Sequence, residues 1–163
     1  MENNTLGAHK ERLYNFHRRS IRLKGYDYSQ NGAYFITICN QNRECLFGEI
    51  IGQKMILNDV GKMIDYQWNE LQNKFNNIQL DEYIVMPNHF HGIIIGKIIG
   101  AFKSITTHEY IKGVKKYNWP SFNNAIWQRN YYEHIIRHEE SLNKIREYII
   151  NNPMNWINDE MYQ

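Results

Sequence analysis

The run from Ile78 to Ile95 constrains the fold of this chain more than any other stretch of its sequence. It holds two segments rich in β-branched and aromatic residues, separated by Met86-Pro87-Asn88. Such residues favour strands, whereas proline cannot donate to the ladder of a sheet and favours a bend. The run therefore predicts two neighbouring core strands of one sheet, joined by a tight turn.

The second of these strands begins with His89-Phe90-His91. Residues i and i+2 of a strand point to the same face, roughly 6.5–7 Å apart at Cα. Two imidazoles at that spacing can bind one divalent cation, and such a cation acts as a Lewis acid on phosphate oxygens. The alternative is a pair of hydrogen-bonded structural histidines, because a chain with seven histidines is expected to hold about 0.3 such pairs by composition alone.

The rest of the chain alternates between strand-like and helix-like segments. Two further strands are predicted over residues 32–39 and 125–133, and a hairpin over residues 49–57. Three helices are predicted over residues 58–75, 98–108 and 139–151. The order of strand, helix, two strands, helix and strand is that of a ferredoxin-like sandwich. We therefore predict an α+β fold, with one antiparallel sheet, helices on one face and a C-terminal helix that carries a tyrosine.

That tyrosine is Tyr148, and Asn152 follows it one helical turn later. Residues i and i+4 share one face of a helix, so the phenol and the amide point toward the same neighbour. Tyr148 could attack a phosphate while the amide oxygen of Asn152 completes a metal site. A phenol has a pKa of about 10 and needs a cation or a base to become nucleophilic. The alternative makes Tyr148 a core aromatic and Asn152 a helix-terminal residue before Pro153.

Charge is distributed unevenly along the chain. The net charge of +2 over 163 residues does not by itself indicate a nucleic-acid binder. We predict a basic N-terminal arm over residues 1–30 and a single folded domain over residues 31–163. A local basic arm can contact phosphates, and a solvated extension is the alternative. The candidate DNA-binding residues of the arm are Arg18, Arg19, Arg22 and Lys24.

No apolar run approaches the roughly 18 residues that a membrane-spanning helix requires. The polar start, Met-Glu-Asn-Asn-Thr, does not have the pattern of a secretory signal. We therefore expect a cytoplasmic protein without a membrane partner.

Six stretches of the chain resemble the HUH single-tyrosine transposases, and most closely the REP-associated tyrosine transposases. The similarity runs from about residue 19 to residue 156, and together the stretches are far more specific than either short motif. They are Gly25-Tyr-Asp-Tyr, Ala33-Tyr-Phe-Ile-Thr-Ile-Cys, Met86-Pro-Asn-His-Phe-His-Gly, Gly100-Ala-Phe-Lys-Ser, Trp127-Gln-Arg-Asn-Tyr-Tyr-Glu-His-Ile-Ile-Arg and Tyr148-Ile-Ile-Asn-Asn-Pro.

The resemblance implies metal-dependent cleavage and rejoining of single-stranded DNA. It assigns His89 and His91 to a divalent cation, Mg²⁺ or Mn²⁺, with Asn152 as a third ligand. It makes Tyr148 the nucleophile, which forms a transient 5′-phosphotyrosine and frees a 3′-hydroxyl. The implied partner is a hairpin of REP-like single-stranded DNA, and the active unit is a monomer or a homodimer.

Other polar residues are candidates for DNA contacts. Lys103 and Arg129 could bind phosphates, although ordinary solvated charge is an equal alternative, and His134 could support the site or contact DNA. Tyr131 and Tyr132 are neighbours on a predicted strand and should face opposite sides, so Tyr148 is the preferred nucleophile.

Two alternatives to a transposase remain open at this point. The first is a non-catalytic module that binds single-stranded or hairpin DNA on the same fold. The second is a metal-dependent hydrolase of a diffusible phosphoester. One departure from the family is visible, because only Gly96-Lys97 separates the histidine strand from the next helix, where relatives often carry a longer polar loop.

Overall fold

The computed structural model describes residues 32–159. The predicted basic arm, with Arg18, Arg19, Arg22 and Lys24, lies outside the described residues. Within the described range, no helix is both long enough and apolar enough to cross a membrane.

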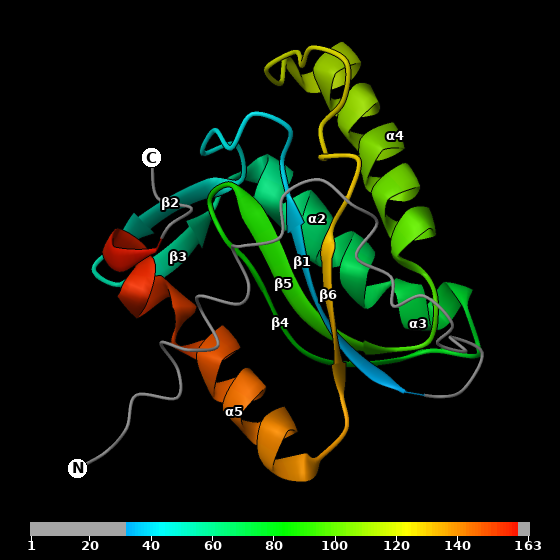
Figure 1. Cartoon of the computed structure of the whole chain (residues 1–163). Helices are drawn as coiled ribbons and strands as arrows, with labels where there is room; N and C mark the ends of the chain where they lie inside the picture. The colour runs from blue at the N-terminus through cyan, green and yellow to red at the C-terminus, as the bar shows by residue number, and fades with distance from the viewer. Residues whose placement is uncertain (1–31, 160–163) are drawn as a thin grey trace.

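One antiparallel sheet forms the centre of the described domain (Figure 1). Its strand order is β4-β5-β1-β6, with every neighbouring pair antiparallel, which is the ferredoxin-like arrangement. The four strands are β1 (Ala33–Cys39), β4 (Gln79–Val85), β5 (His89–Ile95) and β6 (Tyr132–Ile136). The predicted hairpin is also confirmed, as a separate two-stranded sheet formed by β2 (Gly48–Ile51) and β3 (Lys54–Leu57).

Helices cover both faces of the sheet, and each face has its own core (Figure 1). The larger core joins one face to α2 (Asp59–Asn69), α3 (Leu71–Lys74) and α4 (Ile99–Tyr117). The smaller core joins the other face to α5 (Glu139–Ile150), which continues into the 3₁₀ helix η1 (Asn152–Asn158). The α+β fold is confirmed, and the C-terminal helix lies on the face opposite to the other helices.

The helix α2 begins and packs as its sequence predicts. Asn58 caps it, since its side-chain oxygen accepts a hydrogen bond from the Gly61 amide at 2.9 Å. Trp68 is fully buried against Phe90 of β5, with ring centroids 4.6 Å apart. Gly92 allows this close approach, because a Cβ there would lie 2.9 Å from the Trp68 ring.

The helix α4 extends to Tyr117, nine residues beyond the predicted end near residue 108. Threonines in mid-helix and Gly113 obscure the pattern in the sequence. Gly113 has a packing role, because a Cβ there would lie 2.1 Å from the Trp119 ring. Tyr110 is fully buried and donates a hydrogen bond to the Pro120 carbonyl, so tertiary packing overrides weak local propensity.

The last strand was predicted at residues 125–133, but β6 spans Tyr132–Ile136. Residues 125–131 instead form an irregular segment that touches the sheet at a single bridge between Asn40 and Trp127. The Nζ of Lys103 donates to the backbone oxygens of Gln128 and Arg129 at 2.7 and 3.0 Å. In a strand, these carbonyls would instead accept hydrogen bonds from a neighbouring strand. The apolar alternation in this segment therefore reflects burial of Trp127 and not strand pairing.

Candidate active site

The side chains of His89 and His91 converge on the α5 face of the sheet. Both residues lie on β5, where they pair with Cys39 and Thr37 of β1. Their Nε2 atoms are 3.0 Å apart, and both side chains are fully buried. A tetrahedral or octahedral cation holds two ligating nitrogens about 3.0–3.4 Å apart, given bond lengths of about 2.1 Å. The pair is therefore spaced as two ligands of one cation would be.

Both imidazoles are held in the neutral form that a metal ligand requires. Burial lowers the pKa of His89 to about 3, with a smaller contribution from the positive charge of Arg43. Burial also lowers the pKa of His91 well below its usual value, and neighbouring His89 adds to this, whereas Asp159 opposes it. The two rings therefore carry one proton each at neutral pH and keep a lone pair available.

The position of the proton on His89 is fixed by Asn88. The Asn88 amide nitrogen donates to the Arg43 carbonyl at 2.9 Å, which orients its oxygen toward His89. That oxygen lies 2.8 Å from Nδ1 of His89 and can only accept, so Nδ1 carries the proton. The lone pair of His89 is consequently on Nε2, facing His91.

Thr37 can hydrogen-bond to His91 in either tautomer of the ring. Its hydroxyl oxygen lies 2.8 Å from Nδ1 of His91, and both groups are buried. A hydroxyl can donate or accept, so it serves His91 with the proton on either nitrogen. Without a cation, His91 can carry its proton on Nε2 and donate it to Nε2 of His89. When the proton of His91 is instead on Nδ1, the Nε2 lone pairs of both histidines are available to one ion. Metal-binding histidines usually have a carboxylate, a backbone carbonyl or a water behind the ring, and here the Asn88 amide oxygen and the Thr37 hydroxyl take that place.

Tyr148 is brought against this pair by the docking of α5. Ile145 and Ile149 of α5 are buried with Phe35 in the smaller core. The half-buried Tyr148 ring lies 5.4 Å from the His91 ring and 6.0 Å from the Phe35 ring, centroid to centroid. The predicted nucleophile and the predicted metal ligands are therefore adjacent in space, although Tyr148 comes 57 positions after His91 in the sequence.

Asn152 is the first residue of η1 and is 2% exposed. Its Oδ1 is buried and accepts no hydrogen bond within residues 32–159. The rings of Tyr148 and Trp156, four residues before and after Asn152, lie 5.4 Å from His91 and 5.9 Å from His89, so the chain on both sides of Asn152 contacts the histidines. An orphaned buried oxygen is costly, and a cation is one partner that would satisfy it.

The donor set fits a divalent cation that binds nitrogen and neutral oxygen ligands. Residues 32–159 contain no cluster of three or more His, Cys, Asp or Glu side chains that could hold a metal ion. Among these residues, the Asn152 amide is a neutral oxygen donor that could complete the pair of imidazoles. Such a set leaves coordination positions for oxygens of a substrate.

The other predicted DNA-binding residues lie apart from the histidines. His134 is closest, since it pairs with Phe35 on β1 and so lies on the same sheet face, half-buried. Lys103 lies on α4, on the opposite face, where burial lowers its pKa and its ammonium holds two carbonyls. Arg129 is exposed in the irregular segment before β6.

Tyr131 and Tyr132 face opposite sides of the sheet, as predicted. Tyr132 packs in the smaller core, with its ring 6.3 Å from that of Phe35. Tyr131 packs against the larger core, and its hydroxyl donates to Glu133 at 3.2 Å. Only Tyr132 shares the face of the histidines, and it lies on the edge strand.

Sequence reasoning missed Thr37 and Asn88, the two residues that orient the rings. Asn88 could have been noticed, because it directly precedes His89 at a strand start. Thr37 could not, because it meets His91 only through the register of β1 against β5.

Comparisons with known proteins agree with this architecture. Residues 31–152 match the model of the family described as "Transposase IS200 like". An uncharacterized protein of Haemophilus influenzae (strain ATCC 51907 / DSM 11121 / KW20 / Rd) is 42% identical, over 90% of this chain and 93% of its own. A REP-associated tyrosine transposase, solved bound to a REP hairpin, has a similar fold with a TM-score of 0.58 and 19% identity, over 86% of this chain and 73% of its own. The family match spans most of the chain, and the chain belongs to the IS200-like transposase family.

Proposed function

We propose that this transposase cleaves and rejoins single-stranded DNA through a covalent bond to Tyr148. The observation that carries the proposal is the packing of the Tyr148 ring against His91, whose Nε2 lies 3.0 Å from that of His89. A nucleophile and a pair of convergent neutral ligands are the parts that such a reaction needs.

The proposed step exchanges one phosphoester for another. Oη of Tyr148 attacks the scissile phosphorus, the bond from phosphorus to the 3′ oxygen breaks, and the 5′ side stays on the tyrosine. The phenol loses its proton and the leaving 3′ oxygen gains one, so the balance needs no external reductant or energy source. Rejoining is the reverse attack by a 3′-hydroxyl.

His89, His91 and Asn152 are the residues that would hold the divalent cation, Mg²⁺ or Mn²⁺. Bound there, it would polarise the phosphate and stabilise the charge that develops on its oxygens. Asn88 and Thr37 keep the two ring lone pairs directed at one point. Phe35 and α5 hold the phenol beside them.

We propose a hairpin of single-stranded DNA, bound in the cytoplasm, as the substrate. The structural neighbour was solved with a REP hairpin, which supports this choice of partner. The basic residues of the proposed N-terminal arm, residues 1–30, and Arg129 are the candidates for contacts with its phosphates. We propose a monomer or a homodimer as the active unit, and sedimentation of the full chain distinguishes the two.

The test uses the full chain, labelled hairpins from the DNA that flanks its own gene, and Mn²⁺ or Mg²⁺. We expect a covalent DNA–protein adduct that maps to Tyr148 and disappears with EDTA. The variant Tyr148→Phe should lose the adduct, at least 1,000-fold below the wild type, and should keep hairpin affinity within about threefold. Tyr132→Phe is the matched control and should retain the adduct. An adduct that persists in Tyr148→Phe would assign the nucleophile elsewhere.

A second function is favoured by one observation, the complete burial of both histidines. On that reading, the chain is a non-catalytic hairpin-binding module, and the hydrogen-bonded rings are structural. It predicts hairpin binding that does not change with divalent metal, with no adduct under either ion. The same experiment separates the two functions.

A further inference from the structure

The loop of residues 40–47 lies at the His89 end of the sheet. It begins directly after Cys39, the partner of His89 in the pairing of β1 with β5. The backbone amide of Asn40 donates to the Asn88 carbonyl at 3.0 Å, so the loop is bound to the turn that precedes His89. A charged side chain of this loop is therefore placed near the candidate active site.

The charged residue in question is Arg43, and it is fixed by the same side chain that orients His89. The Asn88 amide nitrogen donates to the Arg43 carbonyl at 2.9 Å, and the Asn88 oxygen accepts from Nδ1 of His89 at 2.8 Å. Burial is the larger cause of the low pKa of His89, and the charge of Arg43 adds to it. Burial also raises the pKa of the Cys39 thiol to about 11, and Arg43 opposes that rise. The guanidinium thus lies within electrostatic reach of both side chains.

The Arg43 guanidinium can meet an anion that arrives from solvent. Arg43 is half-buried, and the ion pairs formed among residues 32–159 do not include it. A guanidinium presents N–H donors in a planar fork that matches two oxygens of one phosphate. It is therefore suited to bind a phosphate beside His89.

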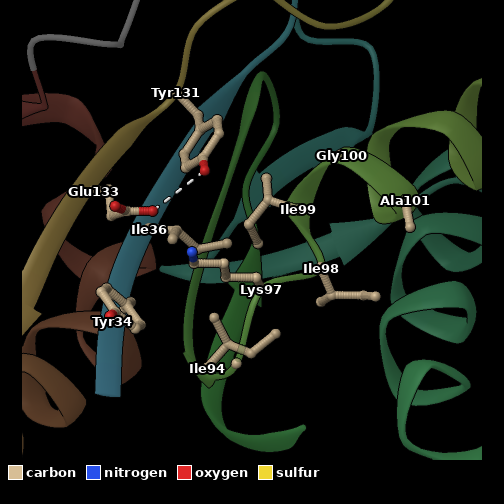
Figure 2. Close-up of a pocket in the computed structure, with 11 residues that line it drawn as sticks. Tyr34, Ile36, Ile94, Lys97, Ile98, Ile99, Gly100, Ala101, Tyr131 and Glu133 are labelled. Atoms are coloured by element: carbon tan, nitrogen blue, oxygen red, sulfur yellow. Dashed lines mark hydrogen bonds between the residues drawn. The ribbon is translucent and has the colours of Figure 1, made fainter. Parts of the chain in front are cut away.

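Three other cationic side chains of the described domain are placed elsewhere. Lys97 lines a cavity of about 220 Å³ on the opposite face of the sheet (Figure 2). Lys103 donates to two backbone carbonyls on that same face, and Arg146 pairs with Asp81. Within residues 32–159, Arg43 is the cationic residue whose charge acts on His89.

We propose that the Arg43 guanidinium binds the scissile phosphate and stabilises the charge that develops on its non-bridging oxygens as Tyr148 attacks. A phosphodiester carries one negative charge, and the attacking phenolate brings a second. The proposed metal ligands His89, His91 and Asn152 are neutral and do not balance it. Arg43 supplies one positive charge and keeps its own protons, so the bonds that form and break are those of the proposed step.

This inference rests on the proposed function, because it adds a catalytic residue to that reaction. It also makes a prediction of opposite sign for the free protein. The positive charge of Arg43 repels a metal ion at the histidines until a phosphate lies between the two. Removal of the charge should therefore strengthen metal binding and weaken catalysis. A residue that only supports the loop would not produce this pair of effects.

The first measurement is the rate of adduct formation by the full chain, with the flanking hairpins, Mn²⁺ and saturating protein. Arg43→Asn should form the Tyr148 adduct at least 100-fold more slowly than the wild type. Asparagine tolerates the backbone of residue 43, at φ +59°, and Asn88 binds only the Arg43 carbonyl, so the variant should fold. Arg43→Lys keeps the charge without the fork and should recover at least tenfold of the loss.

The second measurement is calorimetric titration of Mn²⁺ into the DNA-free chain at low salt. Arg43→Asn should bind Mn²⁺ at least threefold more tightly than the wild type. Arg137→Asn is the matched control, because it removes the same charge from an exposed position after β6, which ends beside Ala33 at the other end of β1. It should change neither the rate nor the Mn²⁺ affinity by more than twofold.

A normal rate of adduct formation in Arg43→Asn would overturn the proposal. A slow rate with Mn²⁺ affinity unchanged or weakened would also overturn it, because the charge would then not lie at the site. If the wild type forms no adduct, the proposed function fails, and hairpin affinity decides on Arg43. An affinity that Arg43→Asn lowers at least tenfold in Mn²⁺, and less than threefold in EDTA, would keep Arg43 as a phosphate contact at the metal site. Any smaller loss in Mn²⁺ would remove that contact too.

Discussion

At the scale of single residues, Thr37 is the group whose role is most easily isolated. It touches His91 through one hydroxyl and is otherwise buried. Thr37→Val keeps the shape of the side chain but removes the acceptor for a proton on Nδ1 of His91. We expect the affinity for Mn²⁺ to fall 10- to 100-fold, as measured by calorimetric titration.

Thr37→Ser provides the control, since it restores the hydroxyl and should bind Mn²⁺ within a few-fold of the wild type. The melting temperature of each metal-free variant separates a loss of folding from a loss of orientation. Equal Mn²⁺ affinity in Thr37→Val and the wild type would show that this hydroxyl does not orient the ring.

Single residues also mark where sequence reasoning succeeds. Alternation along a strand placed His89 and His91 on one face, and the structure brings their Nε2 atoms together. Helical spacing and the family resemblance singled out Tyr148, which packs on His91. Thr37 shows the limit, because strand register depends on the whole sheet and not on neighbouring residues.

At the scale of elements, the position of α5 decides where the phenol lies. An ion pair crosses from this helix to β4: Arg146 donates from Nε to Asp81 Oδ1 at 2.7 Å and from a terminal nitrogen to Oδ2. The Arg146 guanidinium lowers the pKa of Asp81, and its side chain remains 37% exposed. An exposed pair contributes little to global stability, so its effect should appear locally.

We therefore expect Asp81→Asn to loosen α5 more than the sheet. Hydrogen exchange of amides in residues 139–150 should quicken several-fold, while amides of β1 and β5 should be unchanged. Asp59→Asn is the control, because it removes the same charge from a longer and more exposed ion pair, with Lys62 at 3.7 Å on α2. Uniform quickening across all helices would mean that the pair supports the whole domain.

Element boundaries show a second limit of the sequence. Alternation predicted a strand over residues 125–133, yet Lys103 and a buried Trp127 hold that segment outside the sheet. The helix α4 was predicted too short, because Tyr110 and Trp119 stabilise its second half through tertiary contacts. Both errors arise from long-range packing, which local periodicity does not contain.

At the scale of the whole molecule, the buried histidines couple stability to pH. Burial lowers the pKa of His89 to about 3, whereas an unfolded histidine titrates near 6.5. Between these values the unfolded chain binds more protons than the folded chain. The contribution of His89 to the free energy of unfolding therefore has its full value above about pH 6.5 and decreases as the pH falls. The slope approaches about 1.4 kcal/mol per pH unit for each such histidine.

Urea denaturation in EDTA at pH 7.5 and pH 5.0 measures this effect. The wild type should be less stable at pH 5.0, and His89→Gln should lose part of the difference. His138→Gln, at an exposed position, should keep all of it. Equal stability of the wild type at both pH values would contradict the neutral, buried state of the pair.

The two cores of the domain are unequal, and this has a consequence for how the molecule comes apart. Among the described residues, α5 is anchored by a cluster of five buried side chains, whereas the other helices share a much larger one. In a protein whose parts open with different free energies, a helix on a small cluster is an early one to leave. Detachment of α5 would withdraw the phenol and leave the sheet, with both imidazoles, folded. The proposed nucleophile and the proposed metal ligands thus belong to separate cooperative units. Mild denaturant should abolish cleavage of DNA at a concentration well below the one that unfolds the sheet.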